Sequence, residues 1–352
     1  DYSLDNKFIL DIRSMTIKSA QEYYKGSSIF SWYPTMITRG CPNCCTFCTN
    51  SSDVRLRHMR ARSVDMVIKE VKDFLATHSD TKKVFFRDDC ISAMPLVFVE
   101  ELSVKWKKEV GLPCSCSGVI ATSQDFEKKI ELLVDAGFVG FKMGIQSGCE
   151  RVRRFVFARV GETDKVIKEA VSVLHSKCPD GVSYYMITDN PYETEDELVA
   201  SIRFTSSVKR PFSLSLYSLN FYPGTALYNR ALRDKIIDKE SALQESTMRL
   251  KDTYLNWVFL FLRYFEAPYK IIQALTAQKI RHNRVALKLM RCFFQFLLGL
   301  DNPSRYVEIP KFKKEIKYIL ENKKLKLKRW IRIFAWHFFS KMFIFYQRIS
   351  NH

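Results

Sequence analysis

Short runs of β-branched and aromatic residues alternate with segments of helical periodicity from Thr35 to about Ala231. Six runs have the character of strands, at residues 35–38, 83–86, 114–120, 139–145, 182–188 and 213–219. Between them, apolar residues recur at helical spacing, as at Val64, Val67 and Ile68. Repeated βα units build a parallel sheet with right-handed crossovers. The sequence therefore predicts an α/β fold, either doubly wound or, as we favour, a partial (βα)6 TIM-like barrel.

In both folds the binding site lies at the carboxyl ends of the strands. Polar residues follow the predicted strands there: Arg39, Asp88, Asp89, Gln146, Ser147, Asp189, Asn190 and Asn220. We expect these residues to share one rim of the sheet. Helix starts are predicted by capping-box spacing at Thr194 with Glu197 and at Thr122 with Asp125.

The last third of the chain has a different composition. Residues 251–352 contain 21 basic and 6 acidic residues, whereas residues 1–250 contain 35 and 32. We predict a lead-in segment at residues 1–34, the barrel at 35–248, and a basic, aromatic-rich helical region at 249–352. No uncharged apolar run reaches the roughly 20 residues of a spanning helix, so a transmembrane segment is not expected.

The amino terminus has neither a basic segment followed by an apolar one nor an initiator Met, so we expect no secretory signal. We expect this chain to continue something longer. Its ten Cys are too few for a disulfide scaffold, and four of them lie within eight residues. Clustered thiols in a reducing compartment indicate metal binding and predict a cytoplasmic protein.

The four clustered thiols are Cys41, Cys44, Cys45 and Cys48, in which Cys41, Cys45 and Cys48 have the spacing C-x3-C-x2-C. Three thiolates on one loop can hold three irons of a cubane cluster and leave the fourth iron open to a small molecule. Electron-transfer clusters generally have four Cys ligands. The alternative is a zinc site, but zinc usually takes two ligand pairs separated by a longer insertion.

With this motif the sequence resembles the radical S-adenosylmethionine (SAM) superfamily, and within it the branch that often carries an N-terminal cobalamin-binding domain. The resemblance spans about residues 2–231. It rests on Arg39 to Cys48, including Phe47 before the last Cys, and on four later motifs in order. These are Arg60-Ala-Arg62-Ser63, Phe86-Arg-Asp88-Asp89, Gly144-Ile-Gln146-Ser147-Gly148 and Tyr222-Pro223-Gly224-Thr225.

The resemblance implies that Cys41, Cys45 and Cys48 ligate a [4Fe–4S] cluster whose open iron binds SAM. Reduction would cleave SAM to methionine and a 5′-deoxyadenosyl radical. It also implies SAM contacts: Phe47 near the adenine, Asp88 and Asp89 at the ammonium, Gln146 and Ser147 at the ribose, and Asp189 and Asn190 in the adenine loop. An electron donor of the flavodoxin or ferredoxin type is expected.

Three departures from the branch's pattern bear on these roles. Gln146 stands where Glu is common, and residues 188–194 replace a glycine-bearing loop. The chain contains no Asp-x-His-x-x-Gly, so cobalamin is expected only through a domain missing from it. A catalytically silent cluster-binding relative is therefore one alternative, and an RNA-modifying enzyme is another.

The remaining candidates have ordinary structural interpretations. Cys90, Cys114, Cys116 and Cys149 could form a catalytic thiol or second cluster, although buried free Cys commonly acts as a small apolar residue. Residues 323–348 combine basic and aromatic side chains and could contact an anionic membrane at its inner face. Nucleic-acid binding is less favoured. The substrate is expected to be a small molecule or a lipid, converted by C–H functionalisation or methylation.

Overall fold

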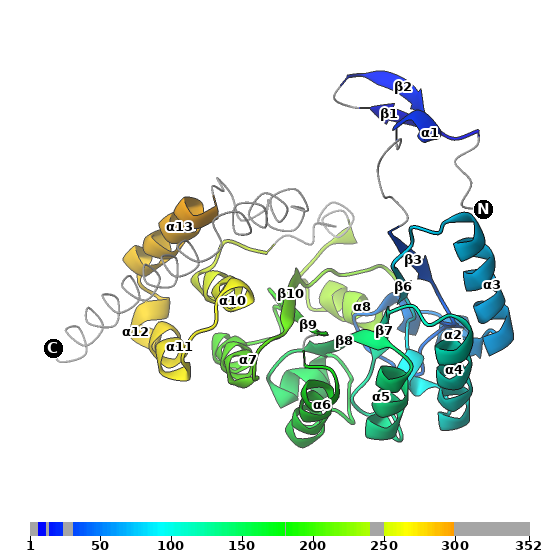
Figure 1. The fold of residues 1–352 in the computed structure, drawn as a ribbon. Coiled ribbons are helices and arrows are strands. Elements are labelled where there is room, and N and C mark those ends of the chain that lie inside the picture. The colour runs from blue at the N-terminus through cyan, green and yellow to red at the C-terminus, as the bar shows by residue number, and fades with distance from the viewer. Residues whose placement is uncertain (1–5, 12–13, 24–30, 180, 240–249, 299–352) are drawn as a thin grey trace.

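The computed structural model describes residues 6–11, 14–23, 31–179, 181–239 and 250–298 (Figure 1). A six-stranded parallel sheet has the strand order β10-β9-β8-β7-β6-β3, so strands that follow one another along the chain are neighbours. Its strands are β3 (Trp32–Thr35), β6 (Lys83–Phe86), β7 (Cys114–Val119), β8 (Phe138–Gln146), β9 (Val182–Thr188) and β10 (Ser213–Ser218). This arrangement confirms the predicted partial barrel.

The helices that connect these strands cover one side of the sheet (Figure 1). They are α3 (Val64–Thr77), α4 (Leu96–Glu109), α5 (Phe126–Asp135), α6 (Asp164–Lys177) and α7 (Glu195–Ser207). Alternate strand residues face these helices: Val84, Phe86, Cys116, Phe141 and Tyr184 are all buried in one large apolar core. The intervening strand residues face the opposite, concave side because side chains alternate along a strand.

Shorter elements surround the barrel. An antiparallel hairpin, β1 (Phe8–Asp11) and β2 (Thr16–Ser19), leads into α1 (Ala20–Tyr23) and stands apart from the sheet in Figure 1. The segment after β3 contains β4 (Thr38–Arg39), the 3₁₀ turn Thr49–Ser51, α2 (Val54–Arg57) and β5 (Arg60–Ala61). The 3₁₀ turn Ile91–Ala93 follows β6, the π-helical turn Val152–Val156 follows β8, and α8 (Ala226–Arg233) follows β10.

The described part of the C-terminal region, residues 250–298, is helical as predicted. It forms α10 (Tyr254–Tyr264), α11 (Tyr269–Leu275), α12 (Gln278–Arg281) and α13 (Arg284–Leu298). Helix α10 contacts α7, α13 and β10, and Trp257, Phe259 and Phe261 join the main apolar core. Helix α10 thus extends the helical layer past β10. The predicted membrane-contact segment, residues 323–348, lies outside the described residues. Among the described helices, each is too short or too polar to span a bilayer.

Two local predictions were wrong. The first strand runs from Trp32 to Thr35 rather than over residues 35–38, because Ile37 and Thr38 donate their backbone N–H groups to the Asp88 carboxylate instead of a neighbouring strand. Helix α5 begins at Phe126 with Asp125 in a left-handed conformation and no side-chain cap, so there is no capping box at Thr122. The capping box of Thr194 and Glu197 is present.

Candidate functional site

The loop that carries the four clustered thiols begins at Gly40, at the carboxyl end of β3. Gly40 has φ +92°, and a Cβ there would lie 2.9 Å from the Leu56 carbonyl oxygen and still closer to that of His58. Only glycine fits this approach without distortion. The Cys41 N–H donates to the Leu56 carbonyl (3.0 Å), and the Ser51 hydroxyl donates to the carbonyls of Cys45 (2.6 Å) and Cys48 (2.7 Å). These bonds hold the thiol loop in one compact turn.

The three predicted ligands share this turn but differ in environment. Cys45 is buried, Cys41 and Cys48 are half-buried, and Cys44 is exposed. A hydrogen bond with the Cys90 thiol lowers the pKa of Cys41 to about 7, whereas burial raises the pKa of Cys45 to about 11 and that of Cys48 above its usual range. The charges of all three thiolates interact. Because metals bind thiolates, binding would displace these protons.

One positive charge lies beside this thiol group. The Arg159 guanidinium donates to the Cys45 sulfur (3.6 Å), to the Gly144 carbonyl (2.9 Å) and to Glu162 (2.6 Å). Its charge favours the thiolates: it contributes to the lowered pKa of Cys41 and opposes the rise in the pKa values of Cys45 and Cys48. Sequence reasoning missed Arg159 because it lies 114 residues from Cys45 in sequence and belongs to none of the recognised motifs.

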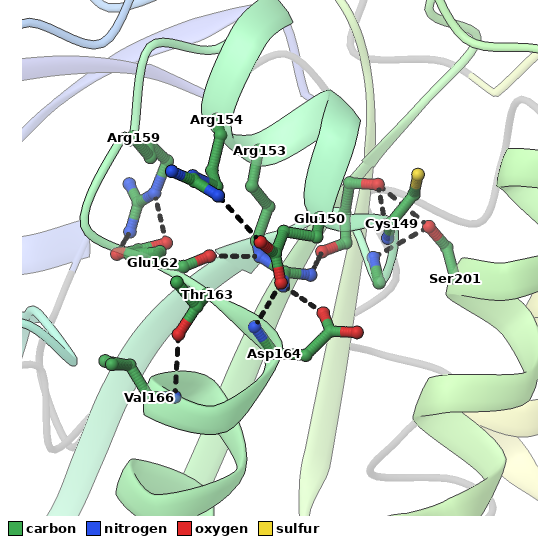
Figure 2. A network of polar contacts seen from close by, with 12 residues as sticks. Cys149, Glu150, Arg153, Arg154, Arg159, Glu162, Thr163, Asp164, Val166 and Ser201 are labelled. Atoms are coloured by element: carbon green, nitrogen blue, oxygen red, sulfur yellow. Dashed lines mark hydrogen bonds and ion pairs between the residues drawn. The ribbon is translucent and has the colours of Figure 1, made fainter.

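Arg159 belongs to a wider network at the end of β8, shown in Figure 2. Arg153 is fully buried and donates to the carbonyls of Ser147 (2.9 Å) and Glu162 (3.0 Å) and to the Asp164 carboxylate. The network ties the carboxyl end of β8 to the loop that enters α6. The Thr46 N–H and hydroxyl bond to the carbonyls of Phe157 (3.1 Å) and Val156 (2.6 Å), which fixes the thiol loop to the same end of β8.

The structure separates the roles of the two neighbouring aspartates. Asp88 is buried and accepts from the Ile37 N–H (3.0 Å), the Thr38 hydroxyl (2.7 Å) and the Thr38 N–H, with its other oxygen unpartnered within the described residues. Asp89 is exposed and accepts from the Gly40 N–H (2.9 Å). Its charge acts on Cys41 and Cys48. Asp88 therefore anchors the segment after β3, while Asp89 lies at the thiol loop itself.

The other predicted SAM contacts occupy the expected rim but have partners of their own. Phe47 packs edge-on against Phe157, with ring centroids 4.9 Å apart. Gln146 ends β8 with φ +70°. Ser147 is fully buried and donates to Glu193 (3.0 Å), which leaves its hydroxyl turned into the protein.

The residues after β9 also face protein groups. Asp189 accepts from the Asn256 side chain (2.7 Å) and from the Lys251 N–H (2.9 Å), so it attaches the start of the C-terminal helical region to the rim. Asn190 is buried; its side-chain oxygen accepts from the Tyr192 N–H (3.0 Å) and its amide nitrogen has no partner within the described residues. Within this pair, only Asn190 retains an uncommitted polar group.

The four other predicted cysteines lie in three different environments. Cys114 and Cys116 are buried in the apolar core on the helical side of the sheet. Cys90 instead contacts Cys41, a proximity between separate strand ends that sequence spacing does not reveal. Cys149 is half-buried and lies 3.6 Å from the Glu197 carboxylate. Among the described residues, no group of three His, Cys, Asp or Glu side chains is arranged to hold a single metal ion.

A six-stranded parallel partial barrel with a three-cysteine loop at the carboxyl end of its first strand defines the class of protein. Residues 35–205 match the model of the Radical SAM superfamily, so this part of the chain is a radical SAM domain. The match begins at the last residue of β3 and ends within α7.

Two curated relatives are each 26% identical to this chain. One is an uncharacterized methyltransferase of Pyrococcus horikoshii, aligned over 57% of this chain and 42% of its own length. The other is cytidylyl-2-hydroxyethylphosphonate methyltransferase of Streptomyces wedmorensis, aligned over 66% of this chain and 43% of its own length. The chain thus spans less than half the length of these relatives.

Two solved structures are similar to this chain at low identity. The radical SAM methyltransferase TsrM from Kitasatospora setae, with cobalamin and a [4Fe–4S] cluster bound, has a TM-score of 0.48 and 15% identity, and the match covers 58% of this chain and 37% of TsrM. Methylornithine synthase (PylB) has a TM-score of 0.46 and 17% identity, with 69% of this chain and 65% of PylB covered.

Proposed function

We propose that this chain holds a [4Fe–4S] cluster on Cys41, Cys45 and Cys48 and acts as a radical SAM enzyme. The single observation that carries the proposal is the position of these three thiols, on one rigid turn at the carboxyl end of the sheet within residues that match the superfamily. The cluster with SAM would supply one-electron cleavage of SAM to methionine and a 5′-deoxyadenosyl radical.

The chain's own residues fit a cluster of this kind in three respects. Three thiols leave one iron of a four-iron cluster without a protein ligand, where SAM would bind. Arg159 supplies a buried positive charge that favours the thiolates. The Phe47–Phe157 pair forms an apolar wall beside the turn, which would exclude water from a reactive intermediate.

The structure favours Asp89 over Asp88 as the contact to the SAM ammonium. Asp88 already accepts three hydrogen bonds from Ile37 and Thr38, whereas Asp89 is exposed and lies beside Gly40. Around the adenosine we keep Gln146, Ser147, Asp189 and Asn190 as the proposed rim, with Gln146 and the Asn190 amide nitrogen as the groups able to reach a ligand. An electron donor of the flavodoxin or ferredoxin type would reduce the cluster.

Methylation is the reaction class that the relatives favour, since both curated relatives are named methyltransferases. We propose hydrogen abstraction or methylation of a small-molecule or lipid substrate, with cobalamin entering only through a domain outside this chain. A contact of residues 323–348 with an anionic membrane remains a separate proposal, tested by flotation with anionic liposomes; absence of flotation would contradict it.

The test of the central proposal is anaerobic reconstitution with iron and sulfide, followed by dithionite and SAM. We expect wild-type protein to form 5′-deoxyadenosine and the variants Cys41→Ala, Cys45→Ala and Cys48→Ala to lose it. Cys44→Ala is the matched control, because Cys44 lies in the same turn but is exposed, and it should retain product formation. A stable cluster without SAM cleavage would support a silent relative, and bound zinc in place of iron would overturn the proposal.

A further inference from the structure

The concave face of the sheet carries positive charge and no acidic counterpart of its own. None of the strands β3, β6, β7, β8, β9 and β10 contains an Asp or Glu. Lys83 and Lys142 alternate with residues of the helical core and therefore face the concave side. Arg87 follows β6 and continues the same alternation. Interiors of closed barrels of this type are filled by apolar side chains, so the half-buried Lys83 and Lys142 on this face require an explanation.

The Phe85 ring organises two of these cations. The Lys142 ammonium lies 4.2 Å and the Arg87 guanidinium 5.5 Å from its centroid. Trp32 packs on the same ring, with centroids 6.2 Å apart. Cation–π contacts hold both positive groups in place before any ligand arrives, so the side chains are already positioned for an anion.

The charges around Lys142 are all of its own sign. Burial lowers the pKa of Lys142, and the positive charges of Arg87 and Lys83 lower it further. The nearby carboxylates are turned toward other groups: Asp88 accepts from Ile37 and Thr38, and Asp89 accepts from the Gly40 N–H at the thiol loop. Within the described residues no carboxylate pairs with Lys83, Arg87 or Lys142. A negatively charged occupant would relieve this repulsion.

Arg87 connects this face to a cavity of about 620 Å³ at the carboxyl end of β3. Arg39, Arg60 and Arg62 also line it, and the one acidic residue, Glu70, is satisfied by Arg62, Tyr33 (2.9 Å) and Thr35 (2.7 Å). Two further guanidinium groups, those of Arg39 and Arg60, therefore line the cavity without a carboxylate partner among its lining residues. Its volume suits a small-molecule ligand.

We infer that the substrate of this enzyme carries a phosphate group, which binds Arg87 and Lys142 on the concave face with Arg39 and Arg60 at the cavity beside it. The inference rests on the proposed function, because it takes this chain to be an enzyme that binds a substrate. A phosphate ester carries about two negative charges at neutral pH, and guanidinium groups match its oxygens in paired hydrogen bonds. Several cations around one cavity match the two negative charges of a phosphate ester better than they match the single charge of a carboxylate.

The test measures binding of inorganic pyrophosphate to the full chain by calorimetry, without SAM or reductant and both with and without a reconstituted cluster. Its outcome is therefore independent of whether SAM is cleaved. We expect Arg87→Gln and Lys142→Gln each to raise the dissociation constant at least about tenfold, the loss of one charge-assisted hydrogen bond. Lys108→Gln makes the same charge change on an exposed residue of α4 and should leave binding within about twofold of wild type.

Three results would overturn the inference. The first is pyrophosphate binding that neither variant weakens, since the basic residues 323–329 could attract anions in a non-specific way. The second is malonate binding as tightly as pyrophosphate, which would show that the site accepts any dianion and does not select phosphate. The third is a single-stranded oligonucleotide that binds more tightly than pyrophosphate and depends on the same residues, which would identify a nucleic acid. Thermal unfolding of each variant separates lost binding from lost folding.

Discussion

Replacing Asp88 by Asn and by Ala distinguishes a residue that anchors the loop from one that contacts SAM. One Asp88 oxygen accepts from the Ile37 N–H (3.0 Å), the Thr38 hydroxyl (2.7 Å) and the Thr38 N–H, while the other has no partner within the described residues. Asn has the same shape and retains the accepting oxygen. Ala removes the acceptor and leaves three donors unpaired near a buried site.

The magnitude follows from those three bonds. Each buried donor left unpaired costs about 1–3 kcal/mol. Allowing for partial relaxation, we expect the Asn variant to exceed the Ala variant in free energy of unfolding by about 3–5 kcal/mol.

The pH dependence gives an independent check. Burial raises the pKa of Asp88 from 3.8 to about 6 despite its hydrogen bonds. The folded protein thus binds the proton more tightly than the unfolded chain, so this carboxyl's contribution to stability is full below pH 4 and is lost as pH rises through about 6. Each pKa unit corresponds to about 1.4 kcal/mol. Asn does not titrate, so this loss is absent from the Asn variant. Its free energy of unfolding should therefore rise by about 3 kcal/mol relative to that of wild type between pH 4 and pH 7.5.

Urea denaturation followed by circular dichroism, at pH 4 and pH 7.5, measures these differences. Calorimetry with SAM on reconstituted protein measures the second role. If Asp88 only anchors the loop, Asp88→Asn keeps SAM affinity, while Asp89→Asn lowers it. Equal destabilisation by Asn and Ala would refute the anchoring argument, and loss of SAM affinity in a stable Asp88→Asn variant would show that Asp88 contacts the ligand.

Two further predictions concern the residues that hold the site. Arg153→Met removes the donor to the carbonyls of Ser147 and Glu162 and to the Asp164 carboxylate. It should lower the free energy of unfolding by about 3–5 kcal/mol. Arg154→Met, which removes a partly exposed pair, should cost about 1 kcal/mol or less; equal urea midpoints for the two variants would contradict the role of burial. Gly40→Ala should reduce iron bound per chain and lower the melting temperature, because its Cβ would overlap the His58 carbonyl. Gly111→Ala has a similar positive φ but no atom closer than 4.0 Å, so it should cost only about 1 kcal/mol and keep its iron; matching iron contents would show that the overlap is relieved.

Periodicity and local motifs were enough to predict the architecture and the thiol loop. The alternation of strand and helix patterns reports on residues close in sequence, because a side chain's facing depends on its own backbone position. The six strand–helix repeats and the Thr194–Glu197 cap follow from such patterns. The first strand was misplaced because its end is set by Asp88, 51 residues from Ile37.

Within the site, the sequence predicted the types of residue but not the groups with which they make contacts. Asp88 and Asp89 are adjacent in sequence, yet one turns into the protein and the other toward the thiol loop. The contact of Cys90 with Cys41 and that of Arg159 with Cys45 join different strand ends. No local pattern encodes which of two neighbouring side chains a distant loop will meet.

The amino-acid sequence alone thus determined the class of fold and predicted the cluster chemistry of the three-cysteine loop, because both predictions depend on spacing along the chain. Only the tertiary structure decided which polar groups stay free for a ligand and which are used by the protein itself. It also brought Arg87 and Lys142 to one aromatic ring from separate strands. Charge becomes a binding site only when the fold places it beside a cavity and away from its counterions, and that depends on packing between distant segments.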